Sequence, residues 1–412
     1  MRIKKYTLMN QNTQVLDFNY DEELNIITEV LNIYNIDFAP YRLKYEYDKN
    51  KNIDRIIINN WYSGRGIPVH RDNVKEIEEQ FNIDTTKELI NKHYALSLSD
   101  QYWVKPFEMQ VKWEDINYFD NSYDAINFTN ATFGENAASS IKGIVNVSSD
   151  KFKTPNNTTD GQLKKVWLKI KNKNYLYKAS GTLYNFEPIN EVIASKICKI
   201  LEVPYVEYEL SVIKSKRQNT LVSICECAIN KNQEVITAYN ILPREERKDF
   251  KDYYNTYLNI LKENNIQNAE EYLQKMFMLD YIMLNEDRHL NNFGIIRDVN
   301  TLEWVSVCPI FDTGRSMNTN VTLSYWDFKL GEVKCFTPNL VPSEVLTEFF
   351  TVNILKSQIN SLKELVNEYG EILNEYKQYT NLSNEQIKML INGLNERIII
   401  FENVMSDKGL IN

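Results

Sequence analysis

The pattern of hydrophobic and polar positions along this 412-residue chain changes from short alternating runs to longer helical stripes. Alternating runs bounded by turn residues predict strands. Such runs lie at 166–170, 175–179, 208–214 and 220–229. The stretch before them, 117–160, is rich in Asn, Ser, Thr and Asp, which predicts loops. A small sheet is therefore expected in the middle of the chain.

Apolar residues at helical spacing predict helices on both sides of this sheet. Pro188 suits the first turn of a helix whose apolar stripe continues to Ile200, and another helix is expected over 269–284. The remaining predicted helices span 22–34, 85–96, 343–379 and 383–405. These elements predict an α+β fold with two lobes and a ligand held between them. Its expected parts are an N-terminal accessory region at 1–117, a small strand-rich lobe at 118–230 and a larger helical lobe at 231–412.

Three polar residues that follow the helix expected at 269–284 carry the clearest chemical signal. Asp287 and Asn292 lie five residues apart. A kinase catalytic loop uses this interval to aim a carboxylate at the attacking hydroxyl and an amide at magnesium. Asp312 follows a predicted hairpin, where a second carboxylate can hold the metal. Each residue alone can also cap a turn, but together they predict a phosphotransferase.

A lysine in the second predicted strand supplies the expected contact with nucleotide phosphates. Lys178 can serve this role if a carboxylate from the following helix holds it in place. Glu191 is the favoured partner, while Glu187 sits where it can instead favour the helix N-terminus. The alternative is that Lys178 is an ordinary solvated strand lysine. His289, inside the catalytic loop, is expected to brace that loop rather than to titrate.

Two further segments are candidates for nucleotide binding. The polar stretch 158–165 precedes the lysine strand; its Gly161 would allow a close approach of the backbone to phosphate, with Gln162 beside it and Lys164 or Lys165 adding positive charge. A single glycine in such a stretch more often marks a turn. Glu226 and Cys227 lie where the two lobes would join, so their backbone is a candidate to receive the adenine.

Composition limits the classes of partner. A net charge of -9 argues against extended binding to a nucleic-acid backbone, so no direct nucleic-acid partner is expected. Five cysteines without a framework spacing predict reduced, packed thiols in a cytoplasmic protein. No apolar run approaches membrane-spanning length, so no membrane association is expected. With only three histidines, chemistry run by carboxylates is favoured.

These motifs resemble those of the HipA-like serine/threonine kinases, a two-lobed protein-kinase-like fold distantly related to phosphatidylinositol kinases. The segments that carry the resemblance are Thr159–Gln162, Lys178, Asn190–Glu191, Asn285–Asn292 and Pro309–Asp312. The resemblance implies ATP and Mg²⁺ as cofactors, Asp287 as the catalytic aspartate, and Asn292 and Asp312 at the metal. It also implies an unidentified protein substrate related to translation, toxin activity and an antitoxin-like protein partner.

Two departures from the family pattern matter. Some members switch themselves off by phosphorylating a serine of the phosphate loop, whereas the nearest hydroxyls here belong to Thr158 and Thr159. The N-terminal region resembles that of a clostridial-type subgroup, in the segment 97–103, rather than the usual family domain. The leading hypothesis is thus an ATP- and magnesium-dependent protein kinase with an accessory region. The alternatives are a kinase of a small molecule or lipid headgroup and a nucleotide-binding pseudokinase that acts as an interaction module.

Overall fold

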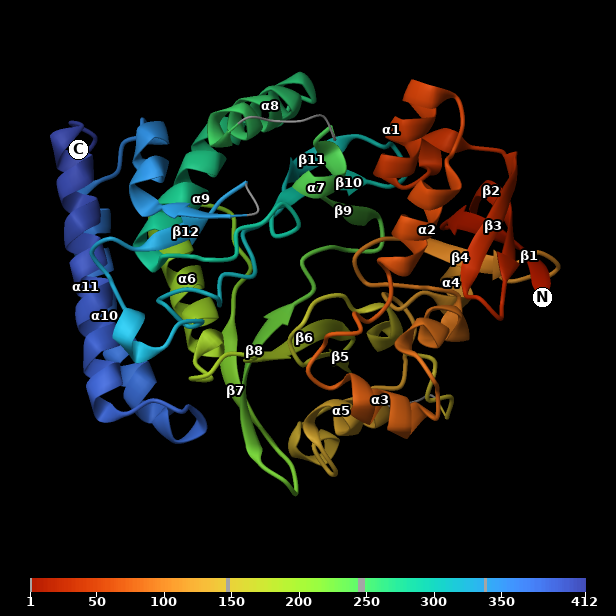
Figure 1. Cartoon of the computed structure of the whole chain (residues 1–412), viewed down its shortest axis with the longest axis horizontal. Helices are drawn as coiled ribbons and strands as arrows, with labels where there is room; N and C mark the ends of the chain where they lie inside the picture. The colour runs from red at the N-terminus through yellow and green to blue at the C-terminus, as the bar shows by residue number, and fades with distance from the viewer. Residues whose placement is uncertain (1, 146–148, 244–248, 337–338) are drawn as a thin grey trace.

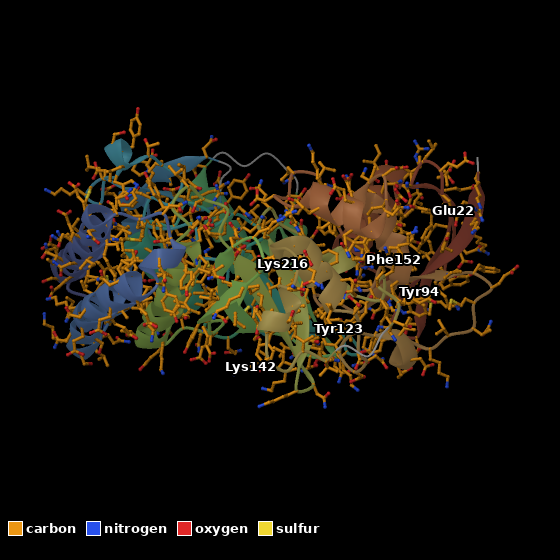
Figure 2. All side chains as sticks on the ribbon, turned by 90° about the horizontal axis from the view of Figure 1, so that it is seen from below. Glu22, Tyr94, Tyr123, Lys142, Phe152 and Lys216 are labelled. Carbon is orange, nitrogen blue, oxygen red and sulfur yellow. The ribbon has the colours of Figure 1, made fainter. Side chains whose placement is uncertain are left out.

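The computed structural model describes residues 2–145, 149–243, 249–336 and 339–412. Its helices and antiparallel sheets form an α+β fold, as predicted (Figure 1). The N-terminal sheet lies at one end of the molecule and the long C-terminal helices lie at the other, with two further sheets between them; the view in Figure 2, in which Glu22 marks the N-terminal sheet, shows the same order. No helix among these residues combines the length and apolar composition needed to cross a bilayer.

The first sheet has the strand order β3-β2-β1-β4. Its strands are β1 (Ile3–Asn10), β2 (Thr13–Asp21), β3 (Ile26–Ile33) and β4 (Tyr102–Pro106), and the helices α1 (Tyr41–Asn50) and α2 (Arg55–Ser63) pack on it. The prediction of a helix at 22–34 is wrong, because this segment contains a turn and the strand β3. Asp21 accepts the backbone N–H groups of Glu23 and Leu24 and closes a turn, after which β3 pairs back along β2. β3 is an edge strand with many exposed residues, so its apolar residues need not alternate with polar ones. Their spacing therefore resembles that of an amphipathic helix.

The second sheet has the order β5-β6-β8-β7 and matches the four predicted strands. These are β5 (Lys165–Ile170), β6 (Lys173–Ala179), β7 (Glu209–Lys214) and β8 (Asn219–Glu226). One hydrophobic core joins this sheet to elements before it, from Met9 to Val222. Those elements include α3 (Val74–Phe81), the 3-10 helix η2 (Thr86–His93), α4 (Trp113–Ile116) and α5 (Ile126–Phe133). Two short 3-10 helices, η3 (Ala138–Ser140) and η4 (Pro155–Thr158), follow before β5. The core therefore crosses the boundary expected near 117, and the helix predicted at 85–96 is a shorter 3-10 helix.

The larger helical part contains a third sheet of order β11-β10-β9. Its elements begin with α6 (Glu187–Leu201), β9 (Gln233–Thr237), α7 (Ala238–Ile241), α8 (Phe250–Glu263), α9 (Ala269–Met283), β10 (Gly294–Asp298) and β11 (Trp304–Val307). They continue with η5 (Leu323–Tyr325), β12 (Glu332–Lys334), β13 (Leu340–Pro342), η6 (Ser343–Phe349), α10 (Lys356–Glu375), η7 (Lys377–Tyr379) and α11 (Asn384–Asp407). A single large hydrophobic core fills this part, and α9 lies inside it with nearly every side chain buried.

The helix predicted over 343–379 is interrupted in the structure. It consists of η6 and α10 with an extended segment between them. The buried Gln274 of α9 explains the break, because its side-chain oxygen accepts the backbone N–H groups of Thr351 and Val352. A residue 77 positions away thus satisfies groups that a helix would otherwise use. The other late helix, α11, begins after the predicted cap Ser383, whose side chain accepts the N–H of Gln386.

A buried ion pair of the third sheet is hydrogen-bonded to the N-terminal sheet. Arg297 of β10 donates to Glu234 of β9, and it also donates to the hydroxyl of Tyr102 in β4. The charged groups lie 2.7 Å apart and each side chain is 3% exposed. Gln101 adds a hydrogen bond to the carbonyl of Gln233. The N-terminal region is therefore fastened to both lobes.

Replacing Glu234 by Gln should lower the free energy of unfolding by about 3 kcal/mol, because the Arg297 charge loses its buried counter-charge. Chemical denaturation of purified protein would measure this change. The matched control is Glu348→Gln, which breaks an exposed pair with Lys251 and should leave the denaturation midpoint unchanged. Equal stability of Glu234→Gln and the parent would contradict the proposed importance of this junction.

Candidate active site

Lys178 is buried at the centre of a carboxylate cluster. It lies in β6 opposite Ser223 of β8 and is 6% exposed. Its ammonium group lies 2.6 Å from Oε1 of Glu191 and also contacts Oδ1 of Asp312 directly. Burial alone would lower the pKa of Lys178, but Asp312 and Glu191 outweigh it and raise the pKa above its ordinary value. Lys178 is therefore not a solvated strand lysine.

The structure distinguishes the two carboxylates that could pair with this lysine. Glu191, one turn into α6, uses Oε1 for Lys178 and Oε2 to accept the backbone N–H of Thr313 at 2.9 Å. Glu187 instead accepts the Ser180 hydroxyl and the Gly181 N–H, each at 2.7 Å. Glu191 therefore ties the lysine strand to the segment that carries Asp312.

Asp312 lies just after β11 with a left-handed backbone, at φ 55°. Burial would raise the pKa of its carboxyl, but Lys178 and Lys165 hold that pKa well below its ordinary range. The carboxylate thus stays ionised at neutral pH, while 33% of its side chain is exposed. An ionised oxygen ligand of this kind suits a hard divalent cation.

Arg288 holds the loop at 285–292 to the Asp312 segment. Its side chain is completely buried and forms an ion pair at 3.0 Å with Asp280, near the end of α9. It also donates to the carbonyls of Asn292 and Phe311 and to the hydroxyl of Thr313. Arg288 lies within the segment Asn285–Asn292 that carries the family resemblance, but no role was predicted for it. The signal in the sequence was an aspartate within the apolar last turns of the helix at 269–284 and an arginine eight residues later.

Asp287 and Asn292 face each other across this loop. The N–H of Asp287 donates to Asn285, and the Asn292 side-chain nitrogen donates to the Asp287 carbonyl at 2.8 Å. This bond uses the nitrogen of Asn292, so its amide oxygen is the atom it can offer a metal. Burial raises the pKa of the Asp287 carboxyl, and the nearby negative charge of Asp312 adds to the rise.

Basic and imidazole groups surround the Asp287 carboxylate at longer range. His289 Nε2 lies 4.0 Å from one of its oxygens, and Arg315 lies 3.7 Å from the other. The backbone N–H of His289 donates to the Asp287 carbonyl, and the ring Nδ1 of His289 accepts the N–H of Asn291. His289 thus braces the loop through its backbone and ring.

The loop before β5 has the backbone freedom that the sequence predicted. Gly161 adopts φ 94°, and a side chain added there would collide with the Lys165 ammonium group. Burial lowers the pKa of Lys165 to about 8, with Asp312 opposing the shift. Gln162 is exposed, and its carbonyl accepts the N–H of Asp72. The structure therefore places Gly161 and Lys165 close to the cluster, while the Gln162 side chain points to solvent.

The predicted hinge is only partly consistent with the structure. Glu226 ends β8 and Cys227 follows it, on the connection to β9 in the third sheet, so the position between the sheets is as expected. However, the N–H of Cys227 already donates to the carbonyl of Asn174 at 2.8 Å. The Glu226 side chain is exposed and pairs with Lys173. The N–H of Cys227 is therefore already used within the protein, and adenine binding by the backbone of Glu226 and Cys227 stays a prediction.

A magnesium site fits these residues if the nucleotide supplies most of the ligands. Among the described residues, no group of three or more His, Cys, Asp or Glu side chains could hold a metal alone. Asp312 and Asn292 offer one carboxylate and one amide oxygen. Magnesium is commonly held by one or two protein oxygens together with phosphate oxygens and water. The residues present thus suit a metal that arrives with a phosphate ligand.

Comparison with known proteins finds similar solved structures. No family model and no curated protein matches the chain. Among solved structures it is similar to the proinflammatory kinase CtkA of Helicobacter pylori, with 20% identity and a TM-score of 0.43 over 60% of this chain and 95% of that chain. It is also similar to HipA of Shewanella oneidensis MR-1, solved with HipB and operator DNA, with 13% identity and a TM-score of 0.45 over 97% of this chain and 99% of that chain.

One of these neighbours is named as a HipA and the other as a kinase. Both TM-scores lie below 0.5, so the function proposed below rests on the geometry of this chain's own residues.

Replacing Arg288 by Met should lower the free energy of unfolding by about 3–5 kcal/mol, because Asp280 would remain buried without a counter-charge. The double variant Asp280→Asn with Arg288→Met should recover part of this loss, since it removes both charges. Urea denaturation of the two variants and the parent provides the measurement. A double variant less stable than Arg288→Met alone would contradict the proposed pairing.

Proposed function

We propose that this protein is an ATP- and magnesium-dependent serine/threonine protein kinase of HipA-like type. The observation that carries the proposal is the buried Lys178, held between Glu191 and Asp312. A kinase needs a lysine for the phosphates, a carboxylate that fixes it and a carboxylate for the metal. Each comes here from a different element, namely β6, α6 and the segment after β11.

The residues divide the work of phosphoryl transfer among themselves. Lys178 and Lys165 bind the negative phosphates, and Glu191 keeps Lys178 in position. Asp312 and the amide oxygen of Asn292 would hold Mg²⁺. Bound magnesium supplies charge neutralisation at the transferred phosphate. Asp287 orients the acceptor hydroxyl and takes its proton, a role that its raised pKa favours.

The family resemblance extends the proposal to partners and location. We propose a protein hydroxyl as the acceptor, and an antitoxin-like protein as a binding partner. All five cysteines are free in the structure, which supports a reducing, cytoplasmic setting. Co-purification of the tagged chain from its native cells would test the partner, with Asp287→Asn included to trap a protein substrate.

The first functional prediction concerns the two carboxylates. Purified protein incubated with magnesium and γ-labelled ATP should transfer phosphate to protein, and Asp287→Asn and Asp312→Asn should each reduce transfer at least about 100-fold. The matched control is Asp298→Asn, because Asp298 caps the turn of the same hairpin by accepting the N–H groups of Asn300 and Thr301. It should retain parental activity.

The pattern of results separates the proposal from its alternatives. Transfer to a small alcohol or lipid headgroup, with none to protein, would replace the protein acceptor but keep the centre. ATP binding that is lost in Asp312→Asn, without transfer to any acceptor, would indicate a pseudokinase. The absence of both ATP binding and ATP turnover in well-folded protein would contradict the kinase proposal itself.

A second prediction concerns pH. Lys165 has a pKa of about 8, and only its protonated form attracts phosphate. The dissociation constant for ATP should therefore rise as pH increases from 7 to 9, and protons should be taken up on binding near pH 8.5. Calorimetry in buffers of different ionisation enthalpy measures this uptake. Lys165→Arg should remove the pH dependence, whereas Lys173→Arg, at the exposed end of β6, should keep it.

A further inference from the structure

The segment between α2 and α3 reaches from the N-terminal region to the proposed phosphate loop. Arg71, in this segment, is only 3% exposed. Its Nε donates to the carbonyl of Gly161 at 3.0 Å, and a second guanidinium nitrogen contacts the carbonyl of Thr159. The N–H of Asp72 donates to the carbonyl of Gln162 at 3.3 Å. Three carbonyls of the loop 159–162 are thus held by one segment from far away in the sequence.

These contacts determine which way the loop's N–H groups point. In a trans peptide the carbonyl and the following N–H point in opposite directions. With the Thr159 and Gly161 carbonyls turned toward Arg71, the N–H groups of Asp160 and Gln162 are turned away from it. Neither N–H group has a hydrogen-bond partner among the described residues. The two unpaired N–H groups flank that of Gly161, which the Asp160 carboxylate accepts. Closely spaced backbone N–H groups around a glycine with positive φ can form a binding place for anions.

The charges around the loop favour the same kind of ligand. The Lys165 ammonium group lies beside Gly161, and Arg71 is close enough to contribute to the lowered pKa of Lys165. One Arg71 nitrogen is buried without a partner in the described structure. The carboxylate of Asp160 accepts the N–H of Gly161 at 2.6 Å and offsets part of the positive charge. Two cations therefore meet at a loop whose free N–H groups suit phosphate oxygens.

We propose that Arg71 is the positioning residue of the phosphate loop, contributed by the N-terminal region. It holds the loop carbonyls so that the N–H groups of Asp160 and Gln162 face the phosphates of a nucleoside triphosphate. The proposal rests on the function proposed above and adds a dependence to it: the accessory region helps to form the nucleotide site. Nucleotide affinity therefore depends on how this region packs against the strand-rich lobe.

The test compares Arg71→Ala and Arg71→Lys with the parent, using the full chain. Arg71→Ala should weaken ATP binding about tenfold or more, the loss expected when charge-assisted hydrogen bonds disappear, while adenosine binding stays at the parental level. Arg71→Lys should bind ATP with intermediate affinity, because an ammonium group keeps the charge but cannot hold two carbonyls in a fork. In turnover, KM for ATP should rise by the larger factor and kcat should change little.

The matched control is Arg65→Lys. Arg65 is also a buried arginine of the N-terminal region and donates to the carbonyls of Ala95 and Tyr102, away from the phosphate loop. This variant should keep the parental affinities for ATP and adenosine. Calorimetric titrations with ATP, ADP and adenosine, all in magnesium, give the comparison.

The outcomes separate the two proposals. If the parent does not bind ATP, the proposed function fails and this inference fails with it. If the parent binds ATP and folded Arg71→Ala binds it equally well, only the inference is overturned. An equal loss of ATP and adenosine binding would also overturn it, because the effect would not concern phosphate.

Hydrogen exchange of the parent keeps the proposal testable if the variants do not fold. Addition of magnesium and ATP should slow exchange in the peptide covering 68–74, because the bound phosphates fix the loop that this segment holds. Protection of the peptide covering 285–292 without any change at 68–74 would overturn the proposal.

Discussion

The buried ion pair between Arg288 and Asp280 is the interaction on which the candidate site depends. Neither side chain is exposed, so removal of one charge would leave the other uncompensated in the core. The same guanidinium donates to the carbonyls of Asn292 and Phe311. One side chain therefore fixes the end of α9, the catalytic loop and the residue next to Asp312. Positions this firmly connected can maintain the geometry that phosphoryl transfer requires.

The two aspartates of the site are held in opposite electrostatic environments. Lys178 and Lys165 keep Asp312 ionised, whereas burial raises the pKa of Asp287. Two carboxylates whose surroundings push their pKa values apart usually have different tasks. A metal ligand should remain charged, and a proton acceptor works better with a higher pKa. The direct contact between Lys178 and Asp312 joins β6 to the segment after β11.

Sequence reasoning succeeded where the signal was local. The helices at Pro188 and 269–284, and the strands around Lys178, follow from periodicity that their burial explains. It failed for the helix at 22–34, since an exposed edge strand does not alternate, and for 343–379, where Gln274 interrupts the helix from a distance. The structure brings Lys178, Glu191 and Asp312 together, and Asn292 contacts the Asp287 carbonyl, but the roles of these residues stay predictions. The contact of Arg71 with the phosphate loop joins residues about 90 positions apart, and no local pattern predicts such a pairing.

The central claim is that Asp312 and Asn292 complete a metal site only together with a nucleotide phosphate. Electron paramagnetic resonance with Mn²⁺ in place of Mg²⁺ tests this claim most directly. The free Mn²⁺ signal in the presence of ATP is recorded with and without protein, and again for protein with Mn²⁺ alone. The account predicts that the protein binds Mn²⁺ tightly when ATP is present, weakly without it, and that Asp312→Asn abolishes the difference. Equal binding of Mn²⁺ with and without ATP, or an unchanged result in folded Asp312→Asn, would contradict the account.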